Sequence, residues 1–206
     1  MELQVDQEVK DAFLGKPVQD VKTEVEFWHK AGYDYIPFLP LQHTFEQLMT
    51  SHKSYTNMAD SDDKYERTWA EQGEGRIKTL EDFDQFPWPD ADDANYNLFD
   101  ETKAVLPDGM GIIGSVGGLF EFVWQLMGFE AFSMATVDNT ELLDKMFKRV
   151  REIVHAVFIK MMDYDCIDAV WFCDDIAYTE SMMISPEILR KYTFPWYKKM
   201  AKICKD

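Results

Sequence analysis

Hydrophobic residues recur at helical spacing in the first part of the chain. Val5, Val9 and Phe13 lie four residues apart, which predicts a helix over residues 2–14. A second helix is predicted over residues 20–32, where Asp20 is a candidate cap and Gly32 suits the residue that ends a helix. The chain therefore opens with two amphipathic helices.

Short apolar runs then alternate with helical patterns along the rest of the chain. The runs 33–39, 110–115 and 167–172 are predicted strands, and the last is so apolar that both of its faces are expected to be buried in a parallel sheet. Helices are predicted over residues 79–86, 95–106 and 119–127, from the start signal at 138–141 to Met161, and from Ser185 toward Ile203.

This alternation is typical of α/β folds with parallel strands. It predicts part of a TIM-type (β/α)8 barrel, because a closed barrel usually takes about 250 residues and this chain has 206. A smaller open α/β sheet is the alternative. Residues 1–206 are interpreted as one domain, in which the polar segment 51–75 is an excursion or lid, since long connections inside a compact domain are often functional.

Composition excludes several classes of protein. With 46% hydrophobic and 15% aromatic residues the chain can build a core, and its formal charge of −17 repels nucleic acid and anionic lipid headgroups. Neither a membrane span nor a signal pattern is visible, so we expect a cytoplasmic protein with no membrane partner. The three cysteines, Cys166, Cys173 and Cys204, form no disulfide or metal-knuckle pattern.

Two adjacent carboxylates are the leading catalytic candidates. Asp174 and Asp175 directly follow the predicted strand 167–172, and parallel α/β folds place their sites at the carboxyl ends of strands. One carboxylate can reach a pocket while the other caps or anchors the next loop. The alternative is that both only begin a solvated loop. Tyr178 lies on the same loop and is a candidate for substrate binding.

A glycine turn follows the predicted strand 110–115. Gly117 and Gly118 can let a ligand approach the backbone, next to the free amides of a helix that begins near Leu119. A tight strand-to-helix turn explains the same glycines. Of the four histidines, only His43 closely follows a predicted strand, and it is a further substrate-binding candidate. No complete metal-binding spacing is present, so we predict no metal site within the chain.

Several runs together resemble the uroporphyrinogen decarboxylase superfamily. They are Gly114 to Glu121, Trp124 to Glu130, Val137 to Leu143, Asp174 to Ala177 with Ile184 to Tyr192, and Pro195 to Lys199. The resemblance covers about half of the chain. It implies a barrel, and it implies an activity of one of two kinds: decarboxylation of a porphyrin precursor, or zinc-dependent methyl transfer to or from corrinoid proteins or thiols.

The same resemblance implies that this chain is incomplete. It would begin after the first strand and end before the fifth, so that the chain alone is expected to be inactive. The zinc-binding His-x-Cys of the methyltransferases would lie beyond Asp206. Zinc and a corrinoid partner are therefore expectations for the full-length protein, and no cofactor is expected within the chain.

Methyl transfer is favoured over decarboxylation by what the sequence lacks. The decarboxylases place an aspartate after the second strand, whereas this chain continues from Leu39 into His43 without one, and it has Trp124 where they place a tyrosine. Glu121 and Trp124 complete the predicted pocket. The substrate is expected to be a small molecule or a corrinoid protein, and a homo-oligomer is possible. A true decarboxylase and a catalytically silent binding domain are the alternatives.

The chain by itself is expected to hold no stoichiometric zinc, because its cysteines and histidines show no convergent spacing. Elemental analysis after dialysis against a weak chelator checks this. Near-equimolar zinc in the dialysed chain would contradict it.

Overall fold

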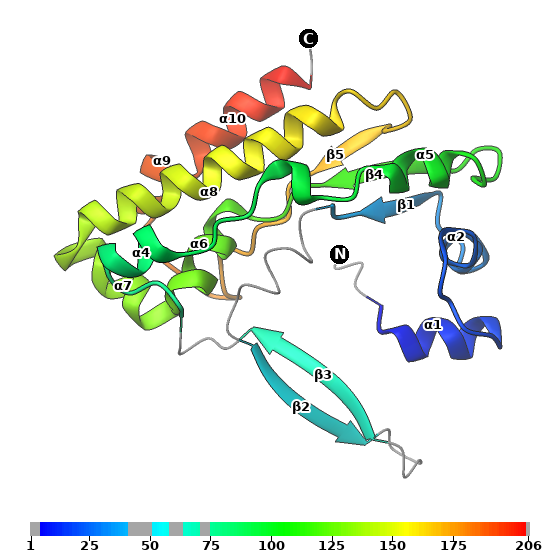
Figure 1. The fold of residues 1–206 in the computed structure, drawn as a ribbon, viewed down its shortest axis with the longest axis horizontal. Helices are drawn as coiled ribbons and strands as arrows, with labels where there is room; N and C mark the ends of the chain where they lie inside the picture. The colour runs from blue at the N-terminus through cyan, green and yellow to red at the C-terminus, as the bar shows by residue number, and fades with distance from the viewer. Residues whose placement is uncertain (1–4, 41–50, 58–63, 71–74, 205–206) are drawn as a thin grey trace.

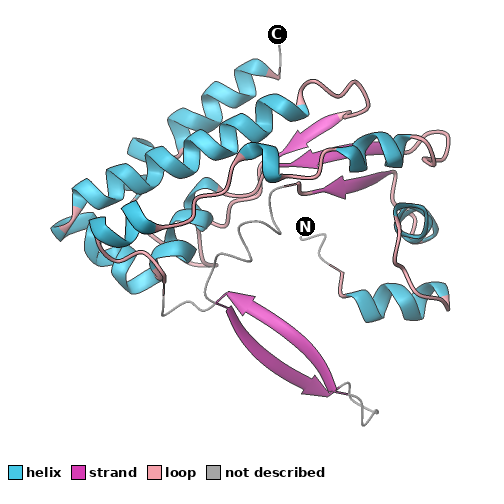
Figure 2. Ribbon diagram, viewed as in Figure 1, coloured by secondary structure: helices cyan, strands magenta, loops and turns pink. Residues whose placement is uncertain are grey.

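The computed structural model describes residues 5–40, 51–57, 64–70 and 75–204. The chain folds into helices around a small parallel sheet (Figures 1 and 2). The strands are β1 (Tyr35–Phe38), β2 (Ser51–Asn57), β3 (Lys64–Ala70), β4 (Gly111–Ser115) and β5 (Ala169–Trp171). The helices are α1 (Gln7–Leu14), α2 (Val21–Lys30), α4 (Leu80–Gln85), the 3-10 turn η1 (Ala91–Asp93), α5 (Asn97–Lys103), α6 (Leu119–Met127), α7 (Phe129–Asp138), α8 (Thr140–Met161), α9 (Pro186–Tyr192) and α10 (Phe194–Ile203).

The three predicted strands form one parallel sheet in the order β1-β4-β5. Ile36 pairs with Ile112, and Gly114 pairs with Val170. Because parallel neighbours need crossover connections, the helices between these strands lie against the sheet. The predicted α/β class is confirmed, and the arrangement is that of part of a TIM-like barrel.

Aromatic side chains on α6, α7 and α8 build the centre of the core. Phe120, Phe132, Phe147 and Phe158 are fully buried, and the ring of Phe147 stacks on Tyr192 of α9 with centroids 4.4 Å apart. The long helix α8 therefore connects the core shared with α6 and α7 to the C-terminal helix α9. Figure 1 shows α8 and α10 running side by side across one side of the sheet.

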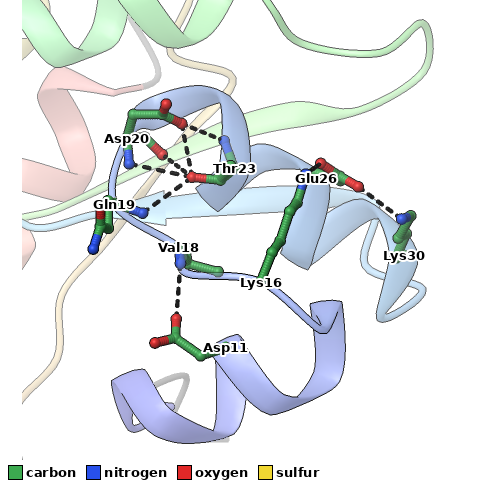
Figure 3. A network of polar contacts seen from close by, with 8 residues as sticks. All are labelled: Asp11, Lys16, Val18, Gln19, Asp20, Thr23, Glu26 and Lys30. Carbon is green, nitrogen blue, oxygen red and sulfur yellow. Dashed lines mark hydrogen bonds and ion pairs between the residues drawn. The ribbon is translucent and has the colours of Figure 1, made fainter.

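Side-chain caps fix the starts of the predicted helices. The Asp20 carboxylate accepts the Thr23 backbone N–H at 2.7 Å, which is part of the capping box shown in Figure 3. Thr79 caps α4 in the same way with Asp82, and Asn139 accepts from Leu142 at the start of α8. These signals were readable in the sequence because capping is local.

Two parts of the prediction are wrong. The single C-terminal helix is divided into α9 and α10 at Thr193, because Pro195 has no N–H and its ring excludes the carbonyl four residues earlier. The helix α7 was not predicted. Its apolar residues do not lie on one face: Phe132 and Ala135 are buried, whereas Val137 is 84% exposed.

The last strand also differs from expectation. β5 is the edge strand of the described sheet, with Ala169 exposed and Val170 and Trp171 only partly buried, so its apolar sequence does not reflect burial on both faces.

In the polar segment 51–75, β2 and β3 pair in antiparallel fashion, with Ser51 opposite Ala70. Within the described residues, no helix has both the length and the apolar character to cross a membrane.

Replacing Phe147 with alanine is expected to lower the free energy of unfolding by about 3 to 5 kcal/mol, because it leaves a cavity under the stacked Tyr192. Urea denaturation measures the change. The control is Val137→Ala, which removes an apolar group that is already 84% exposed and should change stability little. Equal effects of the two changes would contradict the description of the core.

Candidate functional site

The candidate site lies where β4 and β5 end next to each other. The Val116 N–H donates to the Trp171 carbonyl at 3.2 Å, which holds the two strand ends together beyond the ladder. Beside this contact, the side chains of Ser115, the last residue of β4, and Cys173, two residues after Trp171, meet with Oγ and Sγ 3.3 Å apart. The loops that carry the predicted site residues therefore start from a fixed pair of strand ends.

Asp174 binds the start of α6. Its Oδ2 and Oδ1 accept the backbone N–H groups of Phe120 and Glu121, each at 2.9 Å. The first turn of a helix has N–H groups without intrahelical partners, and a carboxylate there is also favoured by the helix dipole. Asp174 thus caps a helix more than fifty residues earlier in the chain. The amides expected to bind an anionic ligand are occupied by this carboxylate.

Tyr197 of α10 completes the surroundings of Asp174. Its hydroxyl donates to Oδ2 of the carboxylate. One side chain at the end of β5 therefore contacts both α6 and α10.

The two glycines are required by this junction. Gly117 has φ +75°, and a Cβ at Gly118 would lie 2.4 Å from Asp174 Oδ1 and 2.5 Å from the Cys173 carbonyl oxygen. Any larger residue at 118 would displace the carboxylate or the backbone. The structure accounts for both glycines by the tight turn, and their predicted contact with a substrate stays a prediction.

Burial dominates the electrostatics of the junction. Desolvation raises the pKa of Asp174 to about 6, against the hydrogen bonds from Tyr197, Phe120 and Glu121, which favour the charged form. Burial also raises the pKa of Tyr197, and the neighbouring Asp174 carboxylate adds to that shift. Asp174 is therefore a carboxyl group that exchanges its proton much closer to neutral pH than an ordinary aspartate does.

Asp175 and Tyr178 lie on the outer part of the loop. Asp175 is exposed, and its carboxylate makes no hydrogen bond or ion pair within the described part of the chain. Tyr178 is 58% exposed and sits on a turn closed by a bridge between Ala177 and Met182. The two adjacent carboxylates therefore differ in environment: Asp174 holds helices together, and Asp175 is open to a ligand.

Trp124 and Glu121 both lie on α6. Trp124 is 6% exposed and packs edge-on against Phe129, with its Nε1 buried and without a hydrogen-bond partner. Glu121 is partly buried in the first turn, and its backbone N–H is one of the two bound by Asp174. The remaining candidate, His43, lies outside the described residues.

Sequence reasoning missed Tyr197 as a member of the site. Its contact with Asp174 spans 23 residues and depends on how α10 returns over the sheet, which no local pattern records. The pairing of Ser115 with Cys173 was missed for the same reason. Of these residues, Cys173 directly precedes Asp174, which the sequence predicts as a site residue.

The described residues do not fit a metal ion. Nowhere in that part of the chain do three His, Cys, Asp or Glu side chains converge, and Cys166, Cys173 and Cys204 are free thiols. We therefore assign no metal-dependent step to these residues.

Comparison with known proteins supports the fold. A methyltransferase from Methanosarcina mazei has a similar structure, with a TM-score of 0.57 and 13% sequence identity over 97% of this chain. The chain spans 59% of the length of that methyltransferase. No family model matches the sequence, and no curated protein matches it.

The pKa of Asp174 predicts how stability depends on pH. The folded chain holds this proton up to about pH 6, whereas the unfolded chain releases it near 3.8, so stability from this residue is greatest below about pH 4 and is lost as pH rises to about 6. The difference in pKa corresponds to about 3 kcal/mol.

Asp174→Asn is therefore expected to remove this decline. The measurement is the free energy of unfolding in urea, compared between wild type and variant from about pH 4 to pH 7. The control is Asp165→Asn, which changes an exposed carboxylate outside the junction. If wild type and Asp174→Asn lose stability in parallel, the proton is not held by Asp174.

Proposed function

We propose that this chain belongs to a methyltransferase, with its pocket at the ends of β4 and β5. The proposal is supported by the similarity of the whole described fold to the methyltransferase from Methanosarcina mazei, although at 13% identity that similarity speaks for the fold and not for the activity. The functional argument therefore rests on the charge of the strand ends.

The observation that carries the proposal is the acidic character of this face. Asp174, Asp175 and Glu121 lie at or beside the ends of β4 and β5. A groove beside the end of β1 is lined by Asp20, Glu24 and Glu101, together with apolar side chains that include Phe38. A substrate that carries many carboxylates would be repelled here.

The described arginines do not offset these acids. Arg149 and Arg151 lie on α8 and Arg190 lies on α9, all on helices and not at strand ends. Arg76 precedes α4 and stacks over the ring of Phe86. This distribution favours a neutral or cationic methyl donor over a polycarboxylate porphyrin precursor, which calls for arginines in its pocket.

The carboxyl groups suit the proton transfer that accompanies methyl transfer. When the acceptor's electron pair forms the new bond to the methyl carbon, the donor atom keeps the pair of the broken bond and can take up a proton. Asp175 is exposed, so a substrate can reach its carboxylate, and the pKa of Asp174, about 6, lets the junction exchange a proton near neutral pH. Trp124 supplies an apolar wall with a buried donor. The acceptor we propose is a thiol or a corrinoid protein.

The full-length protein should transfer methyl groups and should not convert uroporphyrinogen. We expect methylation of a thiol or of a corrinoid protein from a methylated amine, thiol or methanol, followed by mass spectrometry. Anaerobic incubation with uroporphyrinogen, followed by chromatography for coproporphyrinogen, is the competing assay. Turnover of uroporphyrinogen at enzymatic rates without added metal would overturn the proposal.

Asp175→Asn tests the assigned site in the same assays. A loss of about tenfold or more in kcat/KM, which corresponds to about 1.4 kcal/mol, is expected if Asp175 contacts the reacting groups. Asp165→Asn is the matched control, because it removes the same charge from an exposed position in the turn before β5. Equal activity of both variants and the wild type would remove Asp175 from the site.

A further inference from the structure

The charges of this chain are separated between two parts of the fold. Helices α8, α9 and α10 contain ten basic residues, Lys145, Lys148, Arg149, Arg151, Lys160, Arg190, Lys191, Lys198, Lys199 and Lys202. They contain four acidic residues, Glu141, Asp144, Glu152 and Glu187, so that their formal charge is +6. Since the whole chain carries −17, the rest of it carries −23. These helices lie together on one side of the molecule (Figure 1).

Part of this positive charge gathers where α8 meets α9 and α10. Asp144, Lys148, Arg151 and His155 follow one another along one stripe of α8, at intervals of three or four residues. Asp144 at one end of the stripe contacts α9, where it binds Lys191 at 3.0 Å. His155 at the other end contacts α10. We call Lys148, Arg151, His155 and Lys199 the basic seam.

Trp196 of α10 is the centre of the basic seam. The Arg151 guanidinium lies 5.8 Å from its ring centroid and the Lys199 ammonium 4.9 Å from it. The His155 ring meets the Trp196 ring edge-on with centroids 4.8 Å apart, and Lys199 Nζ is 3.5 Å from His155 Nε2. Two cations therefore share one aromatic ring.

The cations of the basic seam have no acidic partner among the described residues. No ion pair joins Lys148, Arg151 or Lys199 to a carboxylate in that part of the chain, although Glu152 lies one helical turn from Lys148. By contrast, Lys160 on the same helix is paired with Asp92. The seam cations are therefore left without carboxylate partners among the described residues, although acidic residues outnumber basic ones in the whole chain.

This arrangement costs stability in the isolated chain. Like charges around one ring repel each other. Two polar atoms at the α8–α10 contact, His155 Nδ1 and Trp196 Nε1, are buried without a hydrogen-bond partner, as is Thr193 Oγ1 between α9 and α10. The cation–π contacts with Trp196 offset only part of this cost, and features that reduce stability are expected at surfaces used for recognition.

We propose that the basic seam binds a short acidic segment of a partner protein. Carboxylates of such a segment would pair with Lys148, Arg151 and Lys199 and relieve their repulsion. The stripe from Lys148 to His155 is about 10 Å long at 1.5 Å per helical residue, which matches about three extended residues. A longer polyanion such as a nucleic acid would reach past the seam into the field of the acidic remainder, so charge favours the short segment.

Fluorescence anisotropy with a labelled, end-blocked peptide of about six glutamates tests the seam on the full-length protein. Saturable binding is expected, and it should weaken as salt rises. Lys148→Glu combined with Lys199→Glu should raise Kd by about tenfold or more. The matched control, Lys22→Glu combined with Lys103→Glu, makes the same change in net charge at exposed positions of α2 and α5 and should change Kd by less than about twofold.

Several results would overturn the proposal. They are a lack of saturable peptide binding, an equal loss in both double variants, or tighter binding of a single-stranded oligonucleotide of the same charge than of the peptide. Lys148→Gln combined with Lys199→Gln guards against misfolding, because neutral residues should weaken binding in the same direction while a thermal melt matches that of the wild type. The assay measures peptide binding and not methyl transfer. The proposed binding site can therefore be contradicted without contradicting the proposed activity, and the reverse also holds.

Discussion

This part of the molecule depends on the hydrogen bonds of the partly buried Asp174 carboxylate. It follows β5, caps α6 through Phe120 and Glu121, and accepts a hydrogen bond from Tyr197 on α10. Without it, the first turn of α6 would lose the partner of two N–H groups, and α10 would lose a polar contact with the sheet. The same contact dictates a glycine at 118, because any side chain there would occupy the space of the carboxylate. One residue therefore fixes the relative positions of a strand, a turn and two helices.

Sequence predicted those features that local chemistry determines. The starts of α2, α4 and α8 were readable because Asp20, Thr79 and Asn139 bond to residues three positions away. The three parallel strands were readable because short apolar runs alternate with helical patterns. Helix α7 was not, since its position is set by packing against α6 and α8 while much of its apolar surface remains exposed.

The sequence predicts where a candidate site lies but not how its residues are arranged. The position of Asp174 after an apolar strand predicts a candidate site at the carboxyl edge of the sheet, and the structure does place Asp174 there. Which of two adjacent carboxylates turns inward depends on where α6 and α10 lie, and those positions come from contacts between residues far apart in the chain. The pKa of Asp174 follows from the same long-range burial. The net charge has the same limit as a guide. The value of −17 describes the whole chain and does not reveal the basic seam around Trp196.

The antiparallel pair of β2 and β3 stands in the chain between two strands that are themselves hydrogen-bonded neighbours, β1 and β4. The sheet does not need that insertion for its own ladder, since the pairing of Ile36 with Ile112 is complete without it. The entropy of closing a long connection rises only slowly with its length, by about 0.6 kcal/mol for each doubling. Related chains can therefore lengthen, shorten or exchange this insertion with little loss of stability in the parallel sheet. The segment that follows β1 can then vary in evolution while the junction of β4 and β5 is kept.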